Sequence, residues 1–321
     1  MGKIVSRLRQ FRALVPEPQK EAQTAGGRSG ALRRGSIVYM SHVAHILVRG
    51  FCAAMLILLP ALLLPEISIE AAQAVTLLAL LAAIVVGTEY AAAYPGLIEF
   101  RDAKPYNRAR FVILLSIVLL VTLVQREVLL GAESRNWVVL AAFKLGTTFD
   151  FAFSPVRLMV MSLPQGLPLD HLALVAAAAS LAYLLSIFGL ATLIVLIMIG
   201  YWPHRHRSFN VWINLPNFDP TKGVDVVRRL ERDAHVNILL GIILPFSLPV
   251  LLHISTLMVQ PMTLQSPLAF VWGIALWAFI PVNLILRGVA MHRVAQLVRA
   301  QRRRMAEEED AIPLPARSAY S

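Results

Sequence analysis

The first feature of this sequence that could do chemistry is an ionisable side chain inside an apolar run of membrane length. Glu89 stands in GTEYAAAYPG, near the end of the run 71–93. Charged groups at membrane depth are costly and often mark ion or proton pathways. The tyrosines around Glu89 are typical of a membrane boundary, and Arg101 or Arg108 is near enough in sequence to pair with it. We therefore expect an interfacial ion pair and keep Glu89 as a transport candidate.

Prolines in the last two apolar runs supply the other candidate chemistry. A proline removes a backbone donor and leaves a carbonyl one turn earlier in need of a partner. Neighbouring proline-broken helices are one sequence feature of transporter sites. One hypothesis is therefore a small secondary transporter with its path at these breaks. Its candidate residues are Glu89, Asn237, Pro245, Pro249 and Asn283.

Polar pairs that resemble metal or acid–base sites have simpler explanations. His204 and His206 alternate with arginines in PHRHR, which is typical of a basic boundary anchor. Asp170 precedes His171, but adjacent helical residues do not face each other, and Asp170 fits a helix N-cap. The sequence contains no Walker-type loop, HExxH, GxSxG or CxxCH motif, and a single cysteine, Cys52. We predict no catalytic residue, no metal and no cofactor, and hence not an enzyme.

The composition indicates an integral membrane protein. Hydrophobic residues make up 57% of the chain and charged residues 15%, against roughly a quarter charged in soluble domains. A helix needs about 20 apolar residues to cross a bilayer. The runs that meet this length are 43–64, 71–93, 111–130, 171–200, 236–258 and 268–290. We predict an all-α bundle of six membrane-spanning helices.

The placement of basic residues predicts the orientation of these helices. Of the 30 Lys and Arg residues, 24 fall in the segments 1–42, 94–110, 201–235 and 291–321. Cytoplasmic segments are enriched in Lys and Arg, so we predict a bacterial cytoplasmic (inner) membrane with both termini in the cytoplasm. Anionic lipid headgroups then account for the net charge of +11. We predict the lipid bilayer as a partner, and no nucleic acid.

The apolar segment 137–163 is ambiguous as a span. Lys144, Asp150 and Arg157 would each cost roughly 2.5–3.5 kcal/mol at the membrane centre. A seventh span would also move the segment 201–235 outside, against the positive-inside bias. We therefore predict one interfacial or re-entrant helix on the outer side of the membrane.

The chain accordingly divides into five segments. The N-terminal segment carries an amphipathic helix near Ile4–Val15 and a linker-like stretch, 17–36, with the composition of a disordered region. Ala178, Ala182 and Ser186 place small residues on one face of the fourth span, which predicts a helix contact. The predicted segments are 1–42 (basic N-terminal tail), 43–130 (three spans), 131–170 (outer interfacial segment), 171–290 (three spans with the connection 201–235) and 291–321 (C-terminal tail).

The connection 201–235 contains an unusual apolar stretch. Phe209, Val211, Ile213 and Leu215 alternate with other residues, and this period of two predicts a short strand. Asp219-Pro220 has the pattern of a helix start, and we expect that helix to merge with the fifth span.

A lone strand cannot satisfy its own backbone groups. The candidate partner is Leu97–Ala103, in the other inner connection. Three arrangements stay open: a small ordered cap built from the two connections, a segment in the headgroup region anchored by Trp202 and Trp212, and an edge that binds another protein.

We therefore predict a non-enzymatic subunit, scaffold or assembly factor of a membrane complex. Its partner would be another membrane protein or a second copy of the chain. The predicted partner-binding residues are Phe209, Val211, Trp212, Ile213, Leu215 and Phe218.

Overall fold

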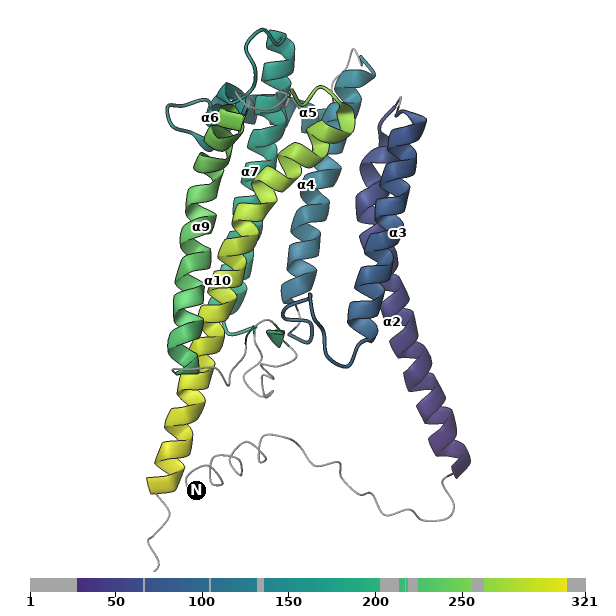
Figure 1. The fold of residues 1–321 in the computed structure, drawn as a ribbon, viewed down its shortest axis with the longest axis vertical. Helices are drawn as coiled ribbons and strands as arrows, with labels where there is room; N and C mark the ends of the chain where they lie inside the picture. Colours follow the sequence, from purple (N-terminus) through teal and green to yellow (C-terminus); the bar gives the residue numbers. More distant parts are fainter. Residues whose placement is uncertain are drawn as a thin grey trace, which may run out of the picture. The chain divides into compact units, whose positions relative to one another are not determined.

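The described part of the protein consists of helices and their connections and contains no strand. The computed structural model describes residues 28–65, 67–103, 105–131, 136–202, 214–216, 218, 225–255 and 263–310, with side chains from Val43 onward except those of residues 255 and 308–310. The chain divides into two units, Met1–His45 and Ile46–Ser321, and every contact given below lies within the second unit. The helices are α2 (Arg28–Leu63), α3 (Ile69–Ala91), α4 (Tyr106–Leu129), α5 (Trp137–Thr148), α6 (Pro155–Met161), α7 (Leu169–Met198), α9 (Val226–Ser255) and α10 (Pro267–Asp310) (Figure 1).

Six of these helices are long and apolar enough to cross a membrane: part of α2 from Val43 to Leu63, and α3, α4, α7, α9 and α10. They match the predicted spans in number and order, which confirms an all-α, multi-pass membrane protein. Helix α4 begins earlier than the predicted third span, at Tyr106. Helix α9 begins at Val226, before the predicted fifth span, so the helix expected in the connection 201–235 does merge with that span. Each of these helices continues through flanking arginines, whose long side chains can reach the membrane boundary.

The ends of the chain differ from prediction in two places. Helix α2 begins at Arg28, so the last part of the stretch 17–36 is helical rather than disordered. Extending an existing helix costs no new nucleation, and Ala31 and Leu32 are good helix formers. Helix α10 continues without interruption to Asp310, into the predicted C-terminal tail. The predicted amphipathic helix Ile4–Val15 lies outside the described residues.

The prolines do not break the helices that contain them. Helix α9 continues through Pro245 and Pro249, and α10 continues through Pro281. The predicted proline-broken fifth and sixth spans are therefore each one continuous helix. Long helices tolerate proline in a membrane because neighbouring groups can satisfy the released carbonyl.

Helix α7 is the centre of the helical packing. It contacts α4, α5, α6 and α10. The small residues Ala178, Ala182 and Ser186 are all fully buried, so the predicted small-residue face is a contact inside this chain. On α5, a Cβ added to Gly146 would lie 3.1 Å from the backbone nitrogen of Ala177, which shows how closely these two helices approach.

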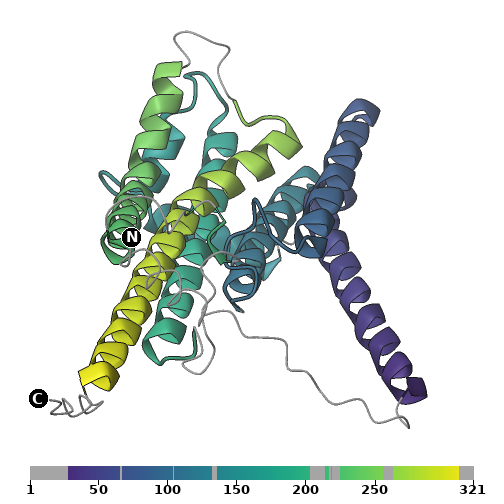
Figure 2. The same ribbon diagram turned by 60° about the horizontal axis from the view of Figure 1, so that its bottom comes forward.

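Helices α9 and α10 run side by side in opposite directions (Figures 1 and 2). A Cβ added to Gly288 of α10 would lie 2.7 Å from the carbonyl oxygen of Ala234 on α9. A Cβ added to Gly241 of α9 would lie 2.5 Å from the carbonyl oxygen of Pro281 on α10. Each glycine thus lets the backbone of the other helix approach closely, as small residues do in membrane helix pairs.

The segment 137–163 forms two short helices rather than the single predicted one. Ser154 is the N-cap of α6, because its hydroxyl accepts a hydrogen bond from the Val156 nitrogen at 3.2 Å. Pro155 occupies the first turn of that helix. The break brings Asp150 and Arg157 together as an ion pair of 3.7 Å. Neither short helix is long enough to cross a membrane, in agreement with a re-entrant or interfacial segment.

Candidate functional site

Two connections that are far apart in sequence meet at one end of the helical bundle. The Phe100 nitrogen donates to the carbonyl oxygen of Asn214 at 2.6 Å, and the Asp102 nitrogen donates to Asn214 Oδ1 at 3.1 Å. Asn214 therefore satisfies two backbone donors of the α3–α4 connection. We call the assembly of residues 96–103, 105–107, 202, 214, 215 and 218 the cap. The cap is the predicted small ordered structure formed by two connections.

Aromatic rings form the interior of the cap. Phe100, Tyr106 and Trp202 pack against one another, with ring centroids 4.5 to 5.8 Å apart. All three are almost fully buried, and the Trp202 indole nitrogen donates to the carbonyl oxygen of Ala103 at 2.8 Å. A buried indole needs such a partner. Trp202 is therefore a core residue of the cap rather than the exposed headgroup anchor considered from the sequence.

The backbone of the cap is strained at one position. Phe100 has a φ of 54°, in the left-handed region that bulky residues rarely adopt. The surrounding contacts compensate, since its ring is fully buried and its nitrogen is hydrogen-bonded.

The predicted partner-binding residues fall into two groups. Leu215 and Phe218 are buried, with 1% and 6% of their surface exposed, and Arg229 lies over the Phe218 ring at 4.7 Å. These two side chains therefore pack within the chain. Phe209, Val211, Trp212 and Ile213 lie outside the described residues. Asn214 is in a helical turn and Leu215 is not in a strand, so the predicted strand does not include them.

An ion pair connects the cap to α10. Both nitrogens of the Arg287 fork bind Glu99, Nε to Oε2 at 2.6 Å and Nη2 to Oε1 at 2.7 Å. The Glu99 side chain is only 12% exposed and that of Arg287 31%. Two-point binding of this kind is among the stronger charge pairs in proteins.

Glu89 also stabilises the α3–α4 connection. Its carboxylate accepts from the backbone nitrogens of Gly96, Leu97 and Ile98 at 2.9 to 3.2 Å. Arg101 does not bind this carboxylate directly. Its Nη1 donates to the carbonyl oxygens of Glu89 and Ala92, at the end of α3. The expected direct ion pair is thus replaced by a backbone-bound carboxylate, which holds the turn after α3.

Ion pairs also join the start of α9 and the residue before it to the C-terminal part of α10. Glu231 pairs with Arg299, and Asp225 pairs with Arg302, each at 2.5 Å. Asp225 is not helical, and α9 begins at Val226. The helix start predicted at Asp219-Pro220 lies outside the described residues. Helix α9 begins directly after Asp225, whose carboxylate accepts from the Val227 nitrogen at 3.4 Å.

The Asp225 contact predicts a pH effect. The hydrogen bond from Arg302 holds the pKa of Asp225 below its ordinary value of 3.8. A lowered pKa adds stability above the ordinary value, and that stability is lost as the pH falls through the lower, folded pKa. We expect the protection of the amides at the start of α9, measured against the intrinsic exchange rate at each pH, to fall more between about pH 6 and about pH 3 in the native chain than in Asp225→Asn. Equal pH responses of the two proteins would contradict this role.

The transport candidates are not brought together. Asn237 Nδ2 donates to the carbonyl oxygen of Asp233 on its own helix at 2.7 Å. Asn283 Oδ1 is buried and has no hydrogen-bond partner in the described part of the chain. Among the described residues, no hydrogen bond or ion pair joins Glu89, Asn237 and Asn283 to one another.

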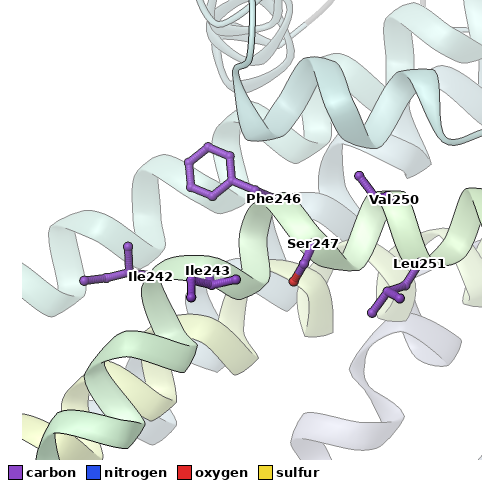
Figure 3. Close-up of a pocket in the computed structure, with 6 residues that line it drawn as sticks. All are labelled: Ile242, Ile243, Phe246, Ser247, Val250 and Leu251. Atoms are coloured by element: carbon purple, nitrogen blue, oxygen red, sulfur yellow. The ribbon is translucent and has the colours of Figure 1, made fainter.

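The surface near Pro245 and Pro249 is an apolar depression on α9. Figure 3 shows its six lining side chains, all from this one helix. Five are exposed hydrophobic residues, and the sixth is Ser247. This composition suits contact with lipid tails and supplies no polar path. The lining residues are Ile242, Ile243, Phe246, Ser247, Val250 and Leu251.

Sequence reasoning missed the residues that assemble the cap. Glu99 and Arg287 are 188 positions apart, and Asp102 and Asn214 are 112 apart. One local feature could have indicated the Glu99–Arg287 pair. Each of these two charged residues lies at the edge of an apolar run, where opposite charges tend to pair.

Among the described residues, no group of three or more His, Cys, Asp or Glu side chains is placed to hold a metal ion. Comparison of the chain with protein-family models, curated proteins and solved structures found no significant match.

Proposed function

We propose that this chain is a non-enzymatic subunit, scaffold or assembly factor of a membrane complex, and that its partner binds beside the cap. The observation that supports the proposal is the burial of the residues that flank the segment 203–213. Trp202 is fully buried before it and Leu215 is buried after it. The segment contains Phe209, Val211, Trp212 and Ile213, and aromatic residues are frequent energetic anchors at protein interfaces.

The cap supports this proposal because it is held by several independent contacts. The Glu99–Arg287 pair, the Asn214 hydrogen bonds and the buried aromatic rings all restrict its motion. A partner that also contacts this ordered cap loses less conformational entropy on association. The partner class that fits is another membrane protein or a second copy of this chain.

We further propose that the cap faces the cytoplasm of a bacterial inner membrane. Exposed arginines gather on the elements that carry it, which fits the positive-inside bias. These residues are Arg108, Arg228, Arg303 and Arg304. Reporter fusions after Phe218 and after Gly166 should report cytoplasm and periplasm respectively, and the opposite pattern would overturn this orientation.

The partner proposal predicts the result of a purification experiment. The full chain, extracted in a mild detergent from its native membrane, should retain a stable partner or form a stable oligomer. Trp212→Ala should reduce the retained partner about tenfold or more, because truncating an aromatic anchor commonly costs at least about 2 kcal/mol. Quantitative mass spectrometry of the purified complex measures the ratio of partner to chain.

Tyr94→Ala is the matched control. Tyr94 is an exposed aromatic residue, 79% accessible, in the connection after α3, and its loss should leave the partner ratio unchanged. A particle that is strictly monomeric in every mild detergent would contradict the proposal. An equal loss in both variants would show that the effect is not specific to the segment 203–213.

A further inference from the structure

Arg110 is a half-buried cation without a carboxylate partner among the described residues. Its Nη1 donates to Asn107 Oδ1 at 3.2 Å, and its Cζ lies 5.5 Å from the centre of the Tyr106 ring. Its Nε is buried and donates to no atom in the described part of the chain. The neutral contacts thus satisfy only part of this guanidinium, which has five N–H donors.

The carboxylates of the neighbouring connection are already engaged. Glu99 is bound at both oxygens by Arg287. Glu89 accepts from three backbone nitrogens, and Asp102 pairs with Arg101 at 3.4 Å. None of these three carboxylates neutralises Arg110. We therefore expect its positive charge to bind an anion that is not part of the described residues.

The local helix adds to this positive potential. Arg110 lies in the second turn of α4, and its contact with Asn107 directs the guanidinium back toward the start of that helix. Helix α4 begins after Pro105 and has no side-chain cap, and a helix N-terminus carries a partial positive charge that favours anions. Arg108 is exposed in the first turn and adds a second cation, although its side chain leaves the helix on a different side.

The position in the bilayer indicates the anion. Helix α4 is a membrane-length helix, and the start of such a helix lies at the depth of the lipid headgroups. Phosphate is the anionic group at that depth, and the planar fork of arginine matches its geometry.

We propose that Arg110 binds the phosphate group of an anionic phospholipid at the start of α4, with Arg108 increasing the local attraction. The site lies on α4 and does not involve the segment 203–213, so it stands independently of the proposed partner. Bound lipid would connect α4 and the cap to the surrounding bilayer, because Tyr106, one turn before Arg110, is part of the aromatic interior of the cap.

The test uses the full chain purified in a mild detergent. Phosphatidylglycerol, phosphatidylcholine and inorganic phosphate are added separately, and native mass spectrometry measures bound lipid while thermal unfolding measures stabilisation. Phosphatidylglycerol should bind and stabilise the native chain. Its apparent affinity should fall about tenfold in Arg110→Gln, and by a smaller factor in Arg110→Lys, which retains the charge but loses the fork.

Arg232→Gln is the matched control. Arg232 is an exposed arginine that pairs with Asp233 at 3.1 Å, and its loss should leave phosphatidylglycerol binding unchanged. Thermal unfolding without added lipid shows whether Arg110→Gln folds. If Arg110→Gln does not fold, the test is whether Arg110→Lys binds phosphatidylglycerol more weakly than Arg232→Gln does. Equal phosphatidylglycerol binding by the native chain and the Arg110 variants would overturn the site. Equal stabilisation by inorganic phosphate would overturn the assignment to a lipid.

Discussion

Arg287→Met should destabilise the protein by about 2–4 kcal/mol, since removing one partner leaves a buried charge uncompensated. The Glu99 side chain, 12% exposed in the native chain, would lose both hydrogen bonds from the arginine fork. The range lies slightly below that of a fully buried pair because the Arg287 side chain is 31% exposed. Unfolding by SDS titration in mixed micelles measures the change in the free energy of unfolding.

A double-mutant cycle separates the ion pair from general damage. Glu99→Gln with Arg287→Met should be more stable than Arg287→Met alone, because the neutral amide needs no counter-charge. Arg232→Gln removes an exposed ion pair and should change stability by less than about 1 kcal/mol. Strict additivity of the two cap substitutions would show that Glu99 and Arg287 contribute independently, against the geometry of the pair.

Gly288→Ala should destabilise the contact between α9 and α10 by about 1–3 kcal/mol, the usual cost of overpacking a close contact. The new Cβ would lie 2.7 Å from the Ala234 carbonyl oxygen and 3.1 Å from the Ile238 nitrogen. Both atoms belong to the backbone, so no side-chain rotation relieves the contact and the helices must separate. Gly241→Ala should act in the same direction, with its Cβ 2.5 Å from the Pro281 carbonyl oxygen.

Gly87→Ala is the matched control for this contact. Gly87 also lies in a long helix, but an added Cβ there would meet only the Ile46 side chain, at 3.9 Å. Alanine favours a helix over glycine by about 1 kcal/mol, so Gly87→Ala should be neutral or stabilising. A stabilising Gly288→Ala, measured in the same unfolding assay, would show that α9 and α10 are not packed as described.

The sequence alone determined the class of the protein, because hydrophobic length is a local property. Runs of about 20 apolar residues require helices in a membrane, where every backbone group must be paired within the segment. The charges of Lys144, Asp150 and Arg157 correctly argued against a seventh span across 137–163. Local patterns served less well at boundaries: the predicted strand does not include Leu215, and Pro245 and Pro249 suggested helix breaks where α9 is continuous.

The tertiary structure alone decided which polar groups find each other. Glu99 and Arg287 stand 188 positions apart, and no helical or strand period connects them. Leu215 and Phe218 have the composition of an exposed binding surface, yet they are buried. They follow Asn214, which binds the α3–α4 connection, and Arg229 of α9 lies over the Phe218 ring. The close contact of Gly241 and Gly288 likewise depends on the relative register of two antiparallel helices. Such pairings follow from the packing of complete helices, and packing depends on surfaces that no single segment contains.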